Sequence, residues 1–103
     1  MVIIWLPLAE KALEDIFLFY EEKSLQIARK IISDIQQATK QLVIFPEMAA
    51  IEHFLLDRPE TFRSLVVRQT YKIVYFIKNQ CIYIADIWDC RQNPTKLGKR
   101  VKT

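Results

Sequence analysis

Four basic side chains in the second half of the sequence are the residues best suited to bind a phosphate group or an acidic partner. Arg63 and Arg68 fall on one predicted strand, and Lys72 falls on the next. Arg91 follows the end of a third strand. If the strands pair in register, Arg63, Lys72 and Arg91 reach one open face of the sheet, where three cations would bind a phosphodiester backbone or an acidic peptide. The alternative is that they are solvated strand residues, which also keep sheet edges from aggregating.

Groups that could move a proton are sparse. Metal-free RNA cleavage requires a base for the 2′-hydroxyl and an acid for the leaving oxygen. His53 is the one histidine, and a lone histidine in an irregular segment is more typical of a surface residue than of a catalyst. Asp86 interrupts an apolar strand, so we expect it to pair with an arginine or a backbone group. Two-metal nucleases need several convergent carboxylates, and the basic half of the chain, residues 61–103, contains only Asp86 and Asp89, so we expect no metal site and no cofactor.

Composition narrows the possible functions further. Gly98 is the single glycine, whereas a P-loop, a dinucleotide-binding turn and a nucleophile elbow each need at least two. Residues 1–60 contain six basic and ten acidic side chains, but residues 61–103 contain nine basic and two acidic ones. A basic C-terminal half is typical of a protein that meets nucleic acid or an acidic partner. A solvated surface with a charged tail is the alternative interpretation.

The hydrophobic pattern predicts which elements must position these side chains. Apolar residues recur every three to four positions in two stretches, and then alternate or run continuously in three shorter ones. Connections of about two residues make the last three strands antiparallel neighbours. We therefore expect one α+β domain over residues 1–103, ordered β-α-α-β-β-β, with a curled antiparallel sheet packed on an N-terminal helical hairpin. The expected elements are a strand at 2–6, helices at 8–22 and 25–45, an irregular segment at 46–61, strands at 62–68, 71–78 and 81–89, and a basic tail from about 93, either short helix or disordered.

Cysteine placement and the first residues favour a cytoplasmic protein. Cys81 and Cys90 lie at opposite ends of one predicted strand, about 30 Å apart, too far for a disulfide. We expect both to remain thiols, as in a reducing compartment. The opening apolar run is too short for a signal peptide, and no stretch has the length of a membrane span.

Three segments carry a resemblance to a known family: YKIVYFIKNQCIYIADIWDCRQNP at residues 71–94, FRSLVVRQTYKIVY at 62–75 and WLPLAE at 5–10. Through these segments the sequence resembles the RelE/ParE family of toxins from bacterial type II toxin–antitoxin systems. The resemblance covers nearly the whole chain, and the order of elements agrees with the one expected from the pattern. It implies a toxin that inhibits growth, as in plasmid stabilisation, and that forms a hetero-oligomer with a small cognate antitoxin.

The family divides by mechanism, and the residues favour one branch. RelE-like members cleave messenger RNA on the ribosome without a metal, and by position Arg63, Lys72 and Arg91 match their basic side chains. Leu65 stands where a second lysine is expected, and Leu97 falls near the place of a late tyrosine. These departures favour a ParE-like toxin that inhibits DNA gyrase by binding it.

Three alternatives stay open at this point. The first is the RelE-like endoribonuclease, the second a non-toxic nucleic-acid-binding module, and the third an inactive relative kept for antitoxin binding. In the binding readings the target-binding residues are Arg63, Arg68, Lys72 and Arg91. For Arg91 the alternative role is a structural ion pair with Asp86 or Asp89.

Overall fold

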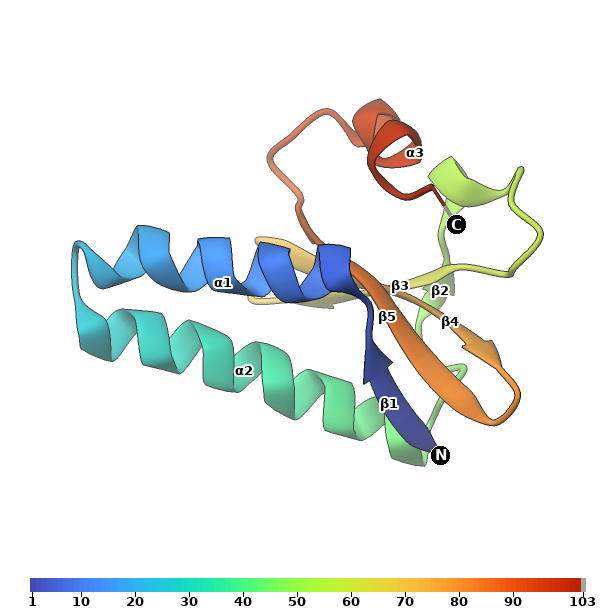
Figure 1. Cartoon of the computed structure of the whole chain (residues 1–103), viewed down its shortest axis with the longest axis horizontal. Coiled ribbons are helices and arrows are strands. Elements are labelled where there is room, and N and C mark those ends of the chain that lie inside the picture. Colours follow the sequence, from blue (N-terminus) through green and yellow to red (C-terminus); the bar gives the residue numbers. More distant parts are fainter. Residues whose placement is uncertain (103) are drawn as a thin grey trace.

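The computed structural model describes residues 1–102 (Figure 1). A five-stranded sheet carries a hairpin of two helices on one face. A short C-terminal helix packs on the other face. The α+β class and the order of the main elements confirm the prediction. In chain order the elements are β1 (Val2–Trp5), α1 (Pro7–Glu21), α2 (Leu25–Ile44), β2 (Ala50–Ile51), a 3₁₀ turn (His53–Leu55), β3 (Arg63–Val67), β4 (Tyr71–Lys78), β5 (Cys81–Asp89), a second 3₁₀ turn (Pro94–Lys96) and α3 (Leu97–Arg100).

The helical hairpin forms where the sequence pattern places it. Pro7 begins α1, where its missing N–H is one that no helical bond would use. The Ser24 hydroxyl accepts a hydrogen bond from the Ile27 N–H (3.2 Å) and so caps α2. Buried alanines of α1 and buried isoleucines of α2 bring both helices close to the sheet. Among residues 1–102, no helix combines the length and apolar character needed to cross a bilayer.

The sheet has the strand order β1-β5-β4-β3-β2. Its three main strands are antiparallel neighbours, as predicted. β1 departs from the expected antiparallel arrangement, because it lies parallel to β5, with Val2 opposite Cys81. β1 leads directly into α1, and α1 packs over β5. β1 therefore runs in the same direction as β5, which makes the sheet mixed. Two residues of the segment expected to be irregular, Ala50 and Ile51, also pair with β3.

Both tight turns of the meander use left-handed backbone. Arg68 and Gln69 have φ of 57° and 60°, and Asn79 and Gln80 have φ of 52° and 61°. Such consecutive positive φ values match the twist of a hairpin. Arg68 was expected at the end of a strand, but its left-handed conformation ends β3 one residue earlier, at Val67.

Each face of the sheet has its own core. The first core lies under the helical hairpin, and the second lies between the opposite face and the C-terminal segment. β5 contains a bulge: Val74 pairs with Asp86 while Tyr75 pairs with Ile84, so one residue of β5 is extra. Ala85 and Asp86 therefore both face the second core, where Ala85 packs and Asp86 makes its ion pair with the C-terminal helix.

The C-terminal tail is helical in part rather than disordered. Leu97 and Val101, four residues apart, are 0% and 1% exposed in the second core. Their burial fixes α3, which four residues could not form alone. The last residue of the predicted tail, Thr103, lies outside the described residues.

Candidate functional site

The four predicted site residues do not share one surface. Arg63 pairs across the ladder with Tyr75, whose side chain lies in the core under the helical hairpin. Lys72 pairs with Trp88, which lies in the core under α3. Paired residues of neighbouring strands project to the same face, so Arg63 and Lys72 point to opposite faces. The predicted convergence of Arg63, Lys72 and Arg91 on one open face is therefore wrong.

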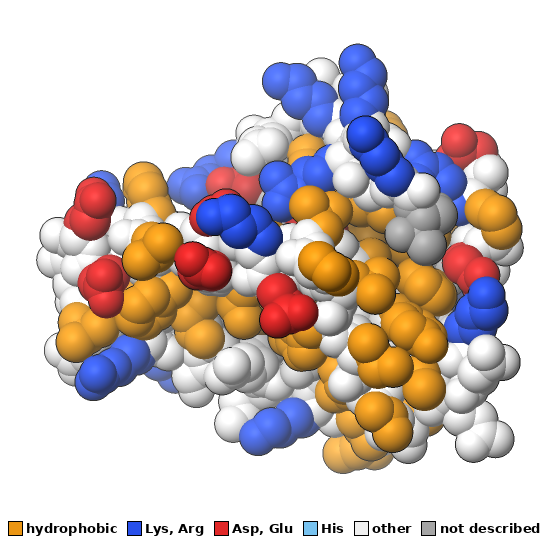
Figure 2. All heavy atoms as spheres, viewed as in Figure 1, with side chains coloured by type: hydrophobic (Ala, Val, Ile, Leu, Met, Phe, Trp, Pro, Cys, Tyr) orange, Lys and Arg blue, Asp and Glu red, His pale blue; other side chains and the backbone are white. Residues whose placement is uncertain are grey.

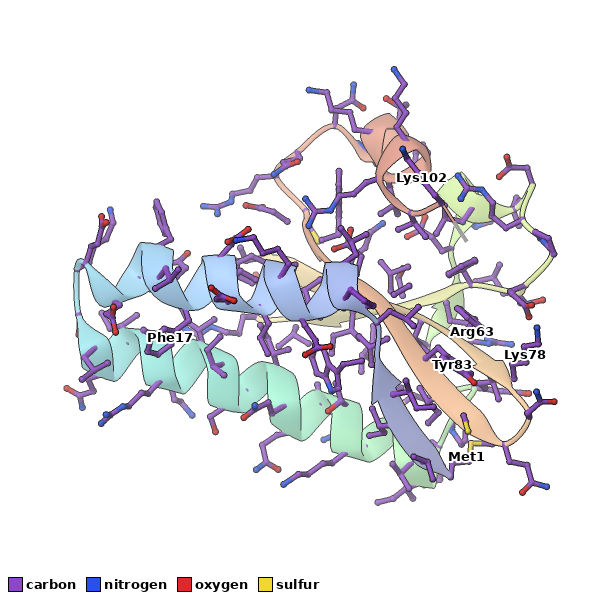
Figure 3. All side chains as sticks on the ribbon, in the orientation of Figure 1. Met1, Phe17, Arg63, Lys78, Tyr83 and Lys102 are labelled. Atoms are coloured by element: carbon purple, nitrogen blue, oxygen red, sulfur yellow. The ribbon has the colours of Figure 1, made fainter. Side chains whose placement is uncertain are left out.

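Arg63 holds the loop that follows α2. Its guanidinium donates to the carbonyl oxygens of Ala49 (2.8 Å) and Glu47 (3.4 Å). The Tyr75 hydroxyl donates to the Pro46 carbonyl in the same loop (2.7 Å). Arg63 is partly buried at the β2 side of the sheet (Figure 3). The Arg63 guanidinium is therefore hydrogen-bonded to backbone carbonyl groups of this loop.

Lys72 is part of a buried polar network on the opposite face. Its ammonium donates to Glu52, a carboxylate only 5% exposed that also accepts from the Ser64 hydroxyl (2.7 Å) and the Phe54 N–H (3.0 Å). Burial alone would raise the pKa of Glu52, but the hydrogen bonds from Lys72, Phe54 and Ser64 outweigh it and hold that pKa below its usual value. Glu52 therefore stays ionised at neutral pH and fixes Lys72 in place.

Arg68 joins the β3–β4 turn to α2. Its guanidinium donates to Asp34 at 2.5 Å, and Lys30 approaches the other oxygen of that carboxylate at 3.1 Å. The hydrogen bond from Arg68, followed by that from Lys30, lowers the pKa of Asp34. This pair is exposed, so its contribution to stability is small.

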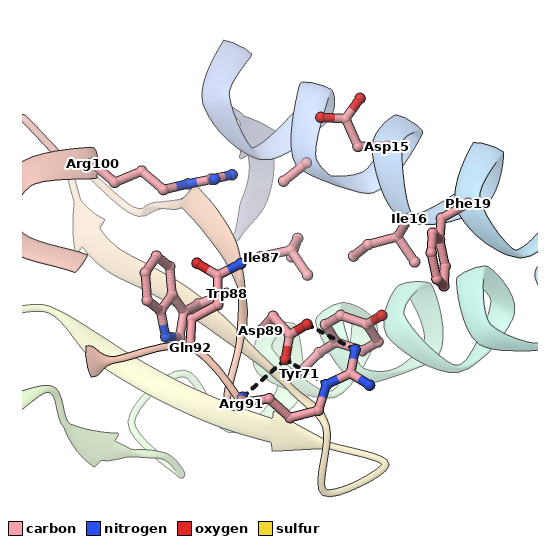
Figure 4. Close-up of a pocket in the computed structure, with 11 residues that line it drawn as sticks. Asp15, Ile16, Phe19, Tyr71, Ile87, Trp88, Asp89, Arg91, Gln92 and Arg100 are labelled. Atoms are coloured by element: carbon pink, nitrogen blue, oxygen red, sulfur yellow. Dashed lines mark hydrogen bonds and ion pairs between the residues drawn. The ribbon is translucent and has the colours of Figure 1, made fainter. Parts of the chain in front are cut away.

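Arg91 lies at the mouth of a cavity of about 280 Å³ between α1 and the end of β5 (Figure 4). Its backbone N–H and its Nε donate to one oxygen of Asp89 (2.9 and 3.0 Å), and its second terminal nitrogen donates to the other oxygen (2.8 Å). The hydrogen bond from Arg91 lowers the pKa of Asp89. The Arg91 side chain remains 65% exposed, so one side of its guanidinium can still meet a partner.

The rest of the cavity lining is mixed, with apolar and aromatic side chains beside the polar Asp15, Asp89, Gln92 and Arg100. Burial, and then a hydrogen bond to the Tyr20 hydroxyl (3.4 Å), raise the pKa of Tyr71. At neutral pH Tyr71 is thus a neutral hydroxyl and Asp89 an ionised carboxylate. The cavity therefore presents a cation and aromatic side chains to a partner. Neither Tyr71 nor Asp89 has a pKa suited to proton transfer near neutral pH. The lining consists of Ala12, Asp15, Ile16, Phe19, Tyr71, Ile87, Trp88, Asp89, Arg91, Gln92 and Arg100.

Asp86 pairs with an arginine and a backbone group, as predicted. The carboxylate is 0% exposed and accepts from Arg100 through both oxygens (2.8 and 3.1 Å) and from the Ile87 N–H (2.8 Å). Burial raises the pKa of Asp86 even though Arg100 opposes the shift. Sequence reasoning did not identify Arg100 as the partner. The available signal was the spacing of Leu97 and Val101, which turns Arg100 toward the sheet.

The remaining groups considered from the sequence carry no assembled chemistry in the described part of the chain. His53 is exposed in a 3₁₀ turn. Cys81 begins β5 and Cys90 follows its last residue; both are free thiols, as predicted. Across residues 1–102 no three metal-binding side chains come together. The roles predicted for Arg63, Arg68, Lys72 and Arg91 in target binding stay predictions.

A mixed sheet with a helical hairpin on one face and a short C-terminal helix on the other defines a small α+β domain of RelE/ParE-like architecture. The sequence model of the family described as the ParE toxin of the type II toxin–antitoxin system, parDE, matches residues 3–94. The chain belongs to this family.

A solved structure supports the same fold. A chain described as "Chromosomal ParDE TA system from P. aeruginosa" is 22% identical to this one. The match covers 86% of this chain and 95% of that chain, with a TM-score of 0.71. Among curated proteins, none matches the chain.

Proposed function

We propose that this chain is the growth-inhibiting toxin of a ParDE-type pair and that it acts in the cytoplasm by binding DNA gyrase. Membership of the ParE toxin family carries the proposal. Under it the cavity beside Arg91 is part of the target-binding surface, because Arg91 keeps an exposed guanidinium next to an aromatic wall. Arginine and aromatic side chains are the residues that contribute most at protein interfaces.

The bonding of the other predicted cations supports binding over RNA cleavage. Arg63 donates to loop carbonyls, and Lys72 donates to the buried Glu52. A ribonuclease acting through these side chains would have to free both of them, leaving Glu52 without its cation. Removing one partner of a buried ion pair costs about 3–5 kcal/mol. We therefore infer that these two residues maintain the fold, and that Arg91 meets the target.

A partner antitoxin is the second part of the proposal. An apolar patch is defined by Met1, Val2, Ile44, Phe45 and Met48; Ile44 and Phe45 are 70% and 64% exposed. Met1, Ile44, Phe45 and Met48 line one depression. Figure 2 shows apolar side chains gathered around the start of β1 and the end of α2. Contiguous apolar surface of this kind marks an interaction site, and we propose that the antitoxin covers it.

The target is tested by two assays in parallel. Purified chain is added to gyrase supercoiling reactions and to ribosomes translating a defined messenger RNA. We expect inhibited supercoiling and intact RNA, with inhibition weakened by Arg91→Ala and kept in Arg29→Ala, which removes an exposed arginine of α2. Cleaved RNA with normal supercoiling would establish the RelE-like alternative. No effect in either assay would favour a non-toxic nucleic-acid-binding module or an inactive relative.

The antitoxin surface is tested by co-purification with the short acidic protein expected from the neighbouring reading frame. We expect Phe45→Asp to abolish co-purification and Val66→Asp, a 57% exposed apolar residue of β3 outside the patch, to leave it intact. Equal loss in both variants, or in neither, would contradict this location.

A further inference from the structure

Within residues 61–102, the positive charge that makes no ion pair or side-chain hydrogen bond lies in the C-terminal segment, not on the sheet. In the described part of the second half, every arginine and both sheet lysines are bonded to a carboxylate or a carbonyl group. Lys96, Lys99 and Lys102 are exposed and make no ion pair or side-chain hydrogen bond with residues 1–102. No acidic residue follows Asp89. We call these three lysines the lysine ridge.

The ridge stands on a single short segment. Lys96 ends the second 3₁₀ turn and Lys99 lies in α3, three residues on, so both project to one side of the helical turns. Lys102 follows the helix end, and its side chain lies over α3 in Figure 3. Figure 2 shows Lys and Arg side chains standing together above α3, with no acidic side chain among them on that face.

The segment beneath the ridge is fixed to the rest of the domain by three sets of contacts, two with the sheet and one with the loop before β3. Leu97 and Val101 are buried in the second core. Arg100 donates twice to the buried Asp86. Arg58 donates to the carbonyl oxygens of Gly98 and Val101. The charges are thus held on a rigid base, which lowers the entropy lost when a partner binds.

The chemistry of the ridge indicates a phosphate backbone. Lysine is a compact point charge that contacts phosphate oxygens without reading base edges. A folded peptide partner would need an aromatic or aliphatic anchor in a pocket, and the ridge presents only ammonium groups. Proteins that hold single strands supply aromatic side chains on which bases stack, and residues 94–102 contain none. A duplex is therefore a better match than a single strand.

We propose that Lys96, Lys99 and Lys102 bind the phosphodiester backbone of duplex DNA. This rests in part on the proposed function and deepens it, because a toxin that acts on gyrase meets the DNA that gyrase holds. The binding is measured without gyrase, so the loss of either proposal leaves the other standing.

The test is fluorescence anisotropy of a short labelled DNA duplex of mixed sequence with the full chain at increasing salt. Three phosphate contacts predict a slope of log K against log salt near about −2.7, equivalent to a roughly 40-fold loss of affinity between 50 and 200 mM salt. The triple variant Lys96→Gln, Lys99→Gln, Lys102→Gln should lose binding and flatten the slope.

A matched triple variant removes the same charge elsewhere. Lys23→Gln, Lys30→Gln and Lys40→Gln neutralise exposed lysines around α2 and should keep both affinity and slope. Equal melting temperatures of the two variants show that folding is not the cause. Equal loss of binding in both variants would overturn the proposal, since net charge rather than the ridge would then bind DNA. Tighter binding to a polyglutamate peptide or to single-stranded RNA than to the duplex would overturn it as well.

Discussion

Replacing Arg100 by alanine tests whether the buried carboxylate of β5 depends on the C-terminal helix. Asp86 is 0% exposed, whereas the Arg100 side chain is 37% exposed. Without Arg100, the carboxylate keeps only the Ile87 N–H as a partner. It then remains a nearly unpaired charge in the second core, and α3 loses one of its contacts with the sheet.

The expected cost follows from this asymmetry. Breaking a buried ion pair by removing one partner costs about 3–5 kcal/mol. Because Arg100 is partly exposed, we expect the lower end, about 3 kcal/mol, equivalent to a fall in Tm of about 12–24 °C. Asp86→Asn removes the buried charge and keeps one oxygen for the Ile87 N–H and one Arg100 nitrogen, but its NH2 faces the other Arg100 donor, so we expect a smaller cost than for Arg100→Ala, about 1–2 kcal/mol. Lys99→Ala is the control: it removes an exposed cation of the same helix at about 0.5 kcal/mol or less.

The dependence on pH separates a charge effect from lost packing. Burial already raises the pKa of Asp86, and loss of Arg100 removes the group that opposes this shift. A pKa higher in the folded than in the unfolded chain means that the folded state binds the proton more tightly. Stability of the variant relative to the parent must therefore rise as the pH falls from 7 toward about 4, the pKa of an unfolded aspartate.

Urea denaturation at pH 7 and pH 5 measures both quantities. The reasoning is refuted if Arg100→Ala costs no more than Lys99→Ala at pH 7. It is also refuted if the difference in unfolding free energy between parent and Arg100→Ala stays constant or grows as the pH falls. A constant difference would mean that Arg100 contributes through packing on Trp88, whose ring centroid lies 5.9 Å from the guanidinium carbon.

Three further predictions concern other parts of the chain. Lys72→Met should destabilise the fold by about 3 kcal/mol, because Glu52 would remain buried without its cation. The pKa of Glu52 in the parent is lowered on folding, so the stabilisation from the Lys72–Glu52 pair should be present at pH 7 and lost as the pH falls through that pKa. Urea denaturation of parent and variant at several pH values measures both effects. Arg91→Ala should change stability by less than about 0.5 kcal/mol because its side chain is 65% exposed, yet abolish growth inhibition; a clear fall in Tm with toxicity kept per folded molecule would remove Arg91 from the target-binding surface. Gln80→Gly should stabilise the chain by about 0.5–1 kcal/mol, measured by thermal denaturation, because glycine adopts the φ of 61° at this turn without strain.

The elements of the fold were predictable because their patterns are local. The apolar stripes of the two helices, Pro46 after the second and the short connections of the meander are visible in the sequence and are found in the structure. The parallel pairing of β1 with β5 was not visible, since it joins residues that are 79 positions apart in the sequence. The burial of Leu97 and Val101 likewise depends on a sheet face that forms elsewhere.

The candidate site was less predictable, because it depends on register and on distant partners. Successive side chains of a strand point to opposite faces, so a register shift of one residue moves a side chain to the other face. Arg63 pairs with Tyr75, an odd number of residues from Lys72, and the two cations therefore lie on opposite faces. The bulge between Val74 and Tyr75 shifts β5 once more. Which carboxylate meets which cation is set by these details. For Asp86, the sequence predicted an arginine or backbone partner but did not identify Arg100 as that arginine.

The pairing of β1 with β5 has a consequence for the order in which the protein folds. Val2 to Trp5 leave the ribosome before the other strands, but their neighbours in the sheet are residues 81–84, which are made 79 residues later. The helical hairpin, whose contacts are local, can form early, while the first strand must wait for most of the chain. Until then Ile3 and Trp5, which pack against the finished core, have no sheet to join. A chain interrupted before Cys81 therefore carries an unpaired first strand, and such edges aggregate.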